Sequence, residues 1–321
     1  MEQSITHPVM YVNPMIDVAF KYLFGTAKHK NLLKGLLEHV FGREIEDINY
    51  DNTEQISDSL TGRSAYFDVY CKAAEGPDFI VECQLKSQEF FTERAVYYAS
   101  RVISNQAPLG GVWNYNFRPV YFLGLMNFPL PGKDKDSIDY VHSFSIRNDR
   151  SGTQMTDRLR FVFMEVGPFS KPLEECETFE DKFLFYMKNL PTFAEKPNTQ
   201  SDKYFEELLQ TAEYLGMDMD TQASYERRLK EMRDIKNVED FARKQAIEEG
   251  MAEGREKGLA EGMAEGREKG LAEGRAEGRA EERQEIVRSL LANGASYELI
   301  ARSLKITIDE VKELAADTPR T

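Results

Sequence analysis

Four polar residues between positions 68 and 86 have the types and spacing of a metal-dependent phosphodiesterase site. The stretch YFDVYCKAAEGPDFIVECQLK predicts two short strands around a Gly-Pro-Asp turn. Because side chains alternate across a strand, Glu82, Gln84 and Lys86 should share one face of the second strand, and we expect Asp68 of the first strand to lie there too. The opposite, apolar face should carry Val69, Cys71, Val81, Cys83 and Leu85.

Two acids on one face of a hairpin are typical ligands of a hard divalent cation. Phosphodiester hydrolysis needs an activated water and stabilisation of the charge on phosphorus oxygens, and Mg²⁺, or Mn²⁺ in its place, supplies both. We expect Asp68 and Glu82 to be metal ligands and the carbonyl oxygen of Cys83 to add a third donor. Asp17, in the first turn of a preceding predicted helix, is a further candidate ligand.

A lysine normally completes such a site, but Gln84 stands at that position. Its amide can orient the water and donate to a phosphate oxygen, although it brings no charge. Lys86, two residues further on, is the candidate source of positive charge, so we expect Asp68, Glu82, Gln84 and Lys86 to be the catalytic residues. A one-residue slip in the hairpin register would separate Asp68 from Glu82.

Two residues of the next predicted helix are candidate phosphate contacts. Arg94 and Tyr98 follow the hairpin closely in sequence. The alternative for Arg94 is an ion pair with Glu82, Glu89 or Glu93.

Hydrophobic periodicity predicts the elements that hold the hairpin. An Asn13-Pro14 cap should begin a helix that breaks near Gly25. The predicted elements are helices over 13–41 and 88–106, strands within 44–56, 118–128, 140–146 and 158–166, and a mostly helical region over 170–234.

Composition limits the class of protein. The chain has 321 residues, 41% of them hydrophobic, which is enough for a proper core. A net charge of -14 argues against broad attraction to nucleic acid or to an anionic membrane, so a nuclease needs bound metal to offset its acids. Three cysteines give no disulfide framework, and no signal peptide or membrane-spanning run is evident. We expect a cytoplasmic protein with no membrane partner.

The tail changes character near residue 249. Glycine recurs at every fourth residue from Gly250 to Gly278, and MAEGREKGLAEG at 251–262 is repeated at 263–274. Two interpretations compete, a flexible polar tether and a helix whose Gly/Ala stripe lets a partner helix approach closely. The second predicts a homo-oligomer.

The last segment, 285–321, predicts three short helices. Gly294 and Ser296 should separate the first two, and Thr307 with Glu310 forms a capping box for the third. The pattern resembles a helix-turn-helix, yet its acidic and basic residues nearly balance, whereas a DNA reader normally has an excess of Lys and Arg. A DNA-binding module and a small packing module both remain open.

Five blocks in order give the chain a resemblance to the PD-(D/E)xK nuclease superfamily, and most to its bacterial recombination-promoting nucleases, also described as transposases. The blocks are DVAFKYLFG, FDVYCKAAEGPDFIVECQ, FTERAVYYASR, RPVYFLGLMNF and RLRFVFMEV, within about residues 10 to 190. In this resemblance Asp68 and Glu82 match the two motif acids, Gln84 the lysine position, and Asp17 the acid of the first helix.

The resemblance implies an α/β, restriction-endonuclease-like fold: a central mixed β-sheet flanked by helices, here followed by a helical C-terminal region. It also implies Mg²⁺-dependent endonucleolytic cleavage of DNA in recombination or mobile elements. We expect a nuclease domain over 1–190, a helical extension over 191–246, the glycine-periodic segment over 247–284 and a helical module over 285–321. The alternative is a catalytically degenerate nuclease fold that oligomerises or tethers DNA.

Overall fold

The computed structural model describes residues 10–55, 65–108, 113–133, 137–199 and 201–316. Residue 56 of the predicted strand segment and residues 317–321 of the C-terminal module lie outside this range. Contacts divide the chain into two compact units, residues 1–233 and 234–321. No helix in the described ranges has the length and apolarity needed to cross a bilayer.

The first unit is built on a six-stranded mixed sheet with the order β1-β4-β5-β6-β8-β7. Strands β5, β6 and β8 run parallel at its centre, and β1, β4 and β7 add antiparallel edges. The strands are β1 (Ile48–Tyr50), β4 (Val69–Ala73), β5 (Asp78–Gln84), β6 (Val120–Met126), β7 (Val141–Ser145) and β8 (Leu159–Glu165). A separate antiparallel pair joins β2 (Glu54–Gln55) to β3 (Ala65–Tyr66). The fold is restriction-endonuclease-like, as expected.

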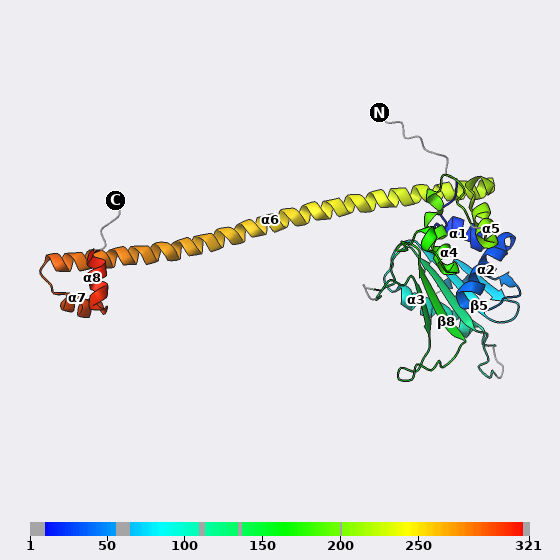
Figure 1. Ribbon diagram of the computed structural model, residues 1–321, viewed down its shortest axis with the longest axis horizontal. Helices are drawn as coiled ribbons and strands as arrows, with labels where there is room; N and C mark the ends of the chain where they lie inside the picture. The colour runs from blue at the N-terminus through cyan, green and yellow to red at the C-terminus, as the bar shows by residue number, and fades with distance from the viewer. Residues whose placement is uncertain (1–9, 56–64, 109–112, 134–136, 200, 317–321) are drawn as a thin grey trace, which may run out of the picture. The chain divides into compact units, whose positions relative to one another are not determined.

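Helices cover both faces of this sheet (Figure 1). One face packs against α1 (Asp17–Phe24), α2 (Lys30–Phe41), α4 (Phe179–Asn189) and α5 (Lys203–Ala212). The other face packs against α3 (Phe91–Asn105), the crossover helix between the parallel strands β5 and β6. Short 3₁₀ turns complete the layer: η1 (Ala27–His29), η2 (Leu173–Glu175), η3 (Leu190–Thr192) and η4 (Tyr214–Gly216).

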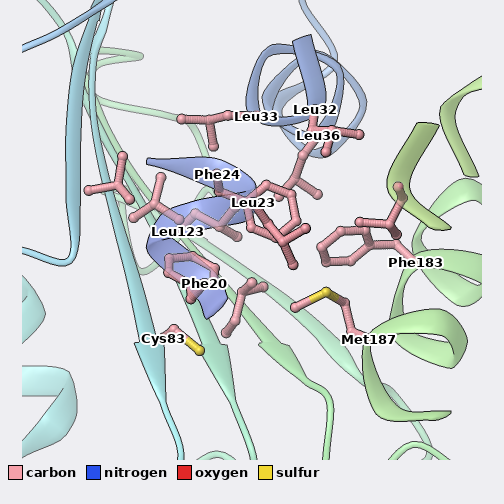
Figure 2. Close-up of a cluster of buried hydrophobic side chains, with 14 of the residues drawn as sticks. Phe20, Leu23, Phe24, Leu32, Leu33, Leu36, Cys83, Leu123, Phe183 and Met187 are labelled. Carbon is pink, nitrogen blue, oxygen red and sulfur yellow. The ribbon is translucent and has the colours of Figure 1, made fainter. Parts of the chain in front are cut away.

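Figure 2 shows the core under the larger helical layer. Phe20 and Leu23 of α1 meet side chains of α2 and α4 above Cys83 of β5 and Leu123 of β6. This core is on the apolar face that the hairpin sequence predicts. The other face is also covered, because Ile80, on the same face as Glu82, is buried in the cluster beneath α3. The hairpin therefore does not present an open polar surface.

The predicted start of the first helix was wrong. Asn13 and Pro14 form a turn, with the backbone N–H of Ile16 donating to the carbonyl of Asn13 at 3.2 Å, and α1 begins only at Asp17. Pro14 is thus the second residue of a turn. The fixed φ of proline is as favourable at this position as in the first turn of a helix. The predicted break at Gly25 is confirmed, since α1 ends at Phe24.

Helix α6 (Met219–Ala292) contains the whole glycine-periodic segment. It begins in the first unit and continues into the second. The first of the three helices predicted after residue 285 is the end of α6 rather than a separate helix. Helices α7 (Tyr297–Leu304) and α8 (Ile308–Ala316) pack on it through Val287, Ile300 and Val311.

Both predicted caps in the C-terminal module are confirmed. Ser296 caps α7, and its hydroxyl accepts the N–H of Leu299 at 3.4 Å. The N–H of Glu310 donates to the Thr307 hydroxyl at 3.2 Å, while the Glu310 carboxylate accepts the N–H of Thr307 at 2.6 Å.

Candidate active site

The hairpin register brings Asp68 and Glu82 together. Val69 of β4 pairs with Val81 of β5. Asp68, the residue before Val69, therefore lies directly opposite Glu82, the residue after Val81. The N–H of Asp68 donates to Glu82 Oε1 at 3.1 Å, and the N–H of Cys83 donates to Asp68 Oδ2 at 2.8 Å. Each carboxylate is therefore fixed by the backbone of the strand that carries the other.

Burial and mutual repulsion strain the charged state of this pair. The Glu82 side chain is 4% exposed and that of Asp68 is 21% exposed. Desolvation raises the pKa of Glu82 to about 8, and the Asp68 carboxylate adds to the rise. Desolvation also raises the pKa of Asp68, against the opposing effects of the Cys83 N–H and Lys21. Such a pair gains stability from a bound cation.

The other two buried acids of the described chain differ from Glu82 because each has a cation in direct contact. Asp78 accepts Arg118 Nε at 2.8 Å. Glu165 accepts Lys133 Nζ at 3.0 Å and His142 Nε2 at 2.8 Å. For Glu82 the guanidinium of Arg94 lies further off, with Nη2 at 3.7 Å from Oε2. Asp78 and Glu165 are therefore neutralised by cations in contact with them, whereas Glu82 has only the more distant Arg94.

The remaining hairpin candidates divide between the site and its surroundings. Gln84 Nε2 donates to Glu82 Oε2 at 3.4 Å, so the amide lies beside the acids as expected. The Cys83 thiol points away from the acids and lies 3.6 Å from the carbonyl oxygen of Met15 in the core. The candidate metal ligand at this residue is therefore the backbone carbonyl oxygen of Cys83. Strand β5 ends at Gln84, so the alternation that predicted the position of Lys86 does not extend to this exposed residue.

Asp17 is the first residue of α1, and its charge contributes to the raised pKa of Asp68. The Asp17 carboxylate is itself paired with Arg228 of α6, whose Nε lies 3.2 Å away. No group of three or more His, Cys, Asp or Glu side chains with metal-binding geometry occurs among the described residues. The structure therefore brings two of the predicted acids together, while Asp17 is held in an ion pair beside them.

Lys21 is a site residue that the sequence reasoning missed. Its Nζ lies 4.0 Å from Asp68 Oδ1, and its side chain is 52% exposed. The available signal was its spacing: Lys21 follows Asp17 by four residues on the same helix, which places both on one face. Lys21 thus brings a positive charge to the acids from the first helix.

Arg94 approaches the pair from α3. Its guanidinium stacks over the rings of Phe91 and Tyr98, at 5.2 and 5.7 Å from their centroids, and Nη1 hydrogen-bonds to Gln88. Its Nη2 is buried and has no hydrogen-bond partner within the described residues. The same Nη2 lies 3.7 Å from Glu82 Oε2, so the predicted alternative of an Arg94–Glu82 ion pair is confirmed.

A cavity of about 540 Å³ adjoins Asp68. Lys21 and Tyr22 of α1, Tyr70 of β4 and Thr221 of α6 contribute to its wall. The volume lies in the range of small-ligand sites. Asp68, but not Glu82, is among the residues that line this space.

A family model described as "PD-(D/E)XK nuclease family transposase" matches residues 14–242. That match covers more than half of the chain and includes every hairpin residue discussed above. The chain belongs to this family. No curated protein and no solved structure gives a match. Membership agrees with the mixed sheet and the paired hairpin acids, and it gives the chain a nuclease ancestry with DNA as the implied substrate.

Proposed function

We propose that this PD-(D/E)XK protein is a Mg²⁺-dependent endonuclease that hydrolyses DNA phosphodiester bonds in recombination or mobile-element biology. The observation that carries the proposal is the convergence of Asp68 and Glu82 in one partly buried site. Family membership supports the same reaction class.

The donor set fits a hard divalent cation. Two carboxylates with raised pKa values, a strand carbonyl at Cys83 and a neighbouring cavity match the few protein ligands that Mg²⁺ takes, since it keeps several waters or substrate oxygens. Such a cation would polarise the phosphorus oxygens and lower the pKa of a water. Asp68, Glu82 and the Cys83 carbonyl would hold it, with Asp17 at the margin of the site.

The side chains around the acids then have separate tasks. Gln84 orients the attacking water, whose oxygen forms the new bond to phosphorus as the bond to the leaving oxygen breaks. Lys21 and Arg94 neutralise charge on the phosphate, because both lie within 4.0 Å of the acid pair and their guanidinium or ammonium groups donate to anions. The attacking water releases a proton to solvent, and the leaving oxygen takes a proton from solvent.

Asp68→Asn tests the mechanism. The change keeps the shape of the side chain and removes the charge, so plasmid nicking with Mg²⁺ should fall by roughly 10³-fold or more, as when an essential polar group is lost. Asp220→Asn, at another acid in the wall of the same cavity, is the matched control and should retain activity. Full nicking by Asp68→Asn with an unchanged melting temperature would exclude this site.

The second candidate is a degenerate nuclease fold that assembles or tethers DNA. The replacement of the motif lysine by Gln84 and the exposure of Lys86 favour it. The two functions separate through metal binding: the degenerate protein would show no nicking and no change in melting temperature with Mg²⁺ or Mn²⁺.

We also propose that the chain forms a homo-oligomer through residues 247–284. Each glycine in a helix interior costs roughly 1 kcal/mol relative to alanine. A Cβ atom at any glycine from Gly250 to Gly278 would meet nothing within 4 Å, so packing within the chain does not require them. Close approach of a second copy would give these glycines a purpose.

A further inference from the structure

Three arginines surround a cavity of about 530 Å³ away from the acid pair. Arg43 follows the end of α2, Arg160 lies on β8, and Arg147 lies just past β7. Ser143 and Ser145 of β7 complete the polar wall. The cavity is therefore lined by hydroxyl and guanidinium donors contributed by three elements that the fold brings together.

None of these guanidinium groups is paired with a carboxylate in the part of the chain that the structure describes. This is unusual in a chain of net charge -14, where Arg118 and Arg228 both form ion pairs. Asp157 also lines the cavity, but within the described ranges it forms no ion pair with the arginines. Their charge is therefore available to an external anion.

The arginines are held in place by contacts that leave donors unused. Arg43 and Arg160 both lie over the ring of Tyr121, at 5.9 and 5.6 Å from its centroid. Arg43 Nη1 donates to the Tyr121 hydroxyl at 3.3 Å, and Arg160 Nη1 donates to the carbonyl of Phe41 at 3.2 Å. Because a guanidinium has five N–H donors, these two hydrogen bonds leave most of the donors of Arg43 and Arg160 for a ligand.

Arg147 is fixed in the same way. Its Nε donates to the Ser145 hydroxyl at 2.9 Å and its Nη1 to the carbonyl of Gly152 at 3.1 Å. These bonds set the guanidinium in position without neutralising it. A preorganised, unpaired set of guanidinium groups is suited to phosphate, which it can contact with paired N–H donors.

The cavity is separate from the acid pair. Tyr121 and Gly124 are three residues apart on β6, roughly 10 Å along the strand, and Gly124 is the residue opposite Glu82. Tyr121 packs in the core beneath α1 and α2, whereas Phe163, the other neighbour of Gly124, packs beneath α3. The two sites therefore lie at different levels of the sheet.

We propose that Arg43, Arg147 and Arg160 bind a phosphate group that is not the one cleaved at the acid pair. The source is either a phosphate of bound DNA, which rests on the proposed function, or a free phosphorylated compound. Both use the same chemistry, and the experiment distinguishes them.

The test uses the full chain with Arg43→Gln and Arg147→Gln combined, since both residues are exposed and neither substitution opens the core. The control combines Arg150→Gln, in the same loop but outside the cavity, with Lys196→Gln, so that the charge change is equal. Inorganic pyrophosphate binding is measured by calorimetry. Duplex DNA binding is measured in EDTA over a range of salt concentrations.

We expect the double variant to bind at least one probe about tenfold more weakly than the control does, as removal of charged hydrogen bonds implies. If DNA is the source, its salt-dependence slope falls by about 0.9 for each DNA phosphate that the variant no longer neutralises. If only pyrophosphate binding falls, the source is a free phosphorylated compound.

Equal binding of both probes by the double variant and the control overturns the proposal. Mg²⁺-dependent nicking by the unmodified chain is recorded separately. Its absence would count against the endonuclease and would leave the pyrophosphate measurement to decide the arginine site.

Discussion

Lys21 and Arg94 each lie next to one of the paired acids, but they differ in accessibility. Arg94 is tied to Gln88, Phe91 and Tyr98, whereas the Lys21 ammonium is half exposed on the cavity wall, 4.0 Å from Asp68. An exposed ammonium beside a proposed metal ligand can follow charge as it develops on a phosphate. We therefore propose that Lys21 takes the place of the missing motif lysine.

Lys21→Met should lower kcat for plasmid nicking by roughly 10²-fold, the usual effect of removing one donor to a developing anion. Melting temperature should change little, because the ammonium is exposed and forms only a long ion pair. Lys28→Met, on the exposed η1 turn, is the control, and Lys21→Arg should restore part of the rate. An unchanged kcat in Lys21→Met would leave Arg94 as the cation of the site.

The raised pKa of Glu82 also predicts how the stability of the folded protein depends on pH. The folded-state pKa is raised from 4.5 to about 8, so the folded protein binds more protons than the unfolded chain between those values. Stability of the metal-free protein should therefore fall as pH rises through this window. Glu82→Gln removes the effect, and its melting temperature in EDTA should exceed that of the unmodified protein by more at pH 8.5 than at pH 5.5.

Two further measurements make the pH prediction specific. Glu46→Gln, at an exposed glutamate, should show no such pH-dependent difference. Mg²⁺ at pH 8.5 should raise the melting temperature of the unmodified chain and leave Glu82→Gln nearly unaffected, because the cation binds the charged carboxylate. A constant difference between Glu82→Gln and the unmodified protein at both pH values would contradict the assignment.

Sequence reasoning predicted the residues of the acid pair because alternation along a strand is a local rule. It placed Glu82 and Gln84 on one face, and the structure keeps them in contact. It did not find Lys21, whose proximity to Asp68 depends on how α1 packs against the sheet. Nor could it show that Arg228, far along the chain, pairs with Asp17.

At the scale of elements, Gly124 of strand β6 makes room for an aromatic ring of the next strand, β8. Gly124 lies opposite Glu82 on one side and Phe163 on the other. A Cβ at this glycine would lie 2.8 Å from Phe163 Cδ1, and that ring is packed against Phe91 and Phe122. The absence of a side chain at Gly124 lets the Phe163 ring pack beneath α3.

Gly124→Ala should destabilise the protein by about 1–3 kcal/mol, the typical cost of overpacking a core. The measurement is the midpoint of urea unfolding at constant m-value. Gly216→Ala, where the added Cβ meets no atom closer than 3.8 Å, is the control and should not lower the midpoint. Equal midpoints for the two variants would mean that Phe163 moves aside without cost.

Most elements of the first unit were predictable from periodicity, and the errors have local causes. The buried run of β6 and the apolar stripe of α3 gave strong signals. The Asn13-Pro14 pair was read as a helix cap, but the N–H of Asn13 donates to the Tyr225 hydroxyl at 2.7 Å. A contact with a residue of α6 thus stabilises the turn there, and no local sequence signal reveals it.

At the scale of the whole molecule, the glycine-periodic part of α6 is the feature whose purpose the first unit does not explain. Every described residue from 233 to 283 is exposed, including Met251, Leu259 and Leu271. From the sequence, this segment could be either a helix or a flexible tether, because Ala, Glu and Lys favour a helix while the glycines oppose it. The structure has a helix, and a partner would compensate for its low propensity.

Replacing Gly258, Gly262 and Gly266 by Ala separates the two roles of the glycine row. Helix propensity should rise by roughly 1 kcal/mol for each substitution, so a helix that acts alone would become more stable without a change in mass. If a second copy packs against the row, the added methyl groups hold the helices apart, and a higher protein concentration is needed to form the oligomer.

Light scattering with size-exclusion chromatography measures the mass, and circular dichroism measures the helix content. Glu268→Ala, in another row of the same repeat, is the control. We expect the triple variant to gain helix content and lose self-association, and a monomeric unmodified chain at micromolar concentration would contradict the homo-oligomer.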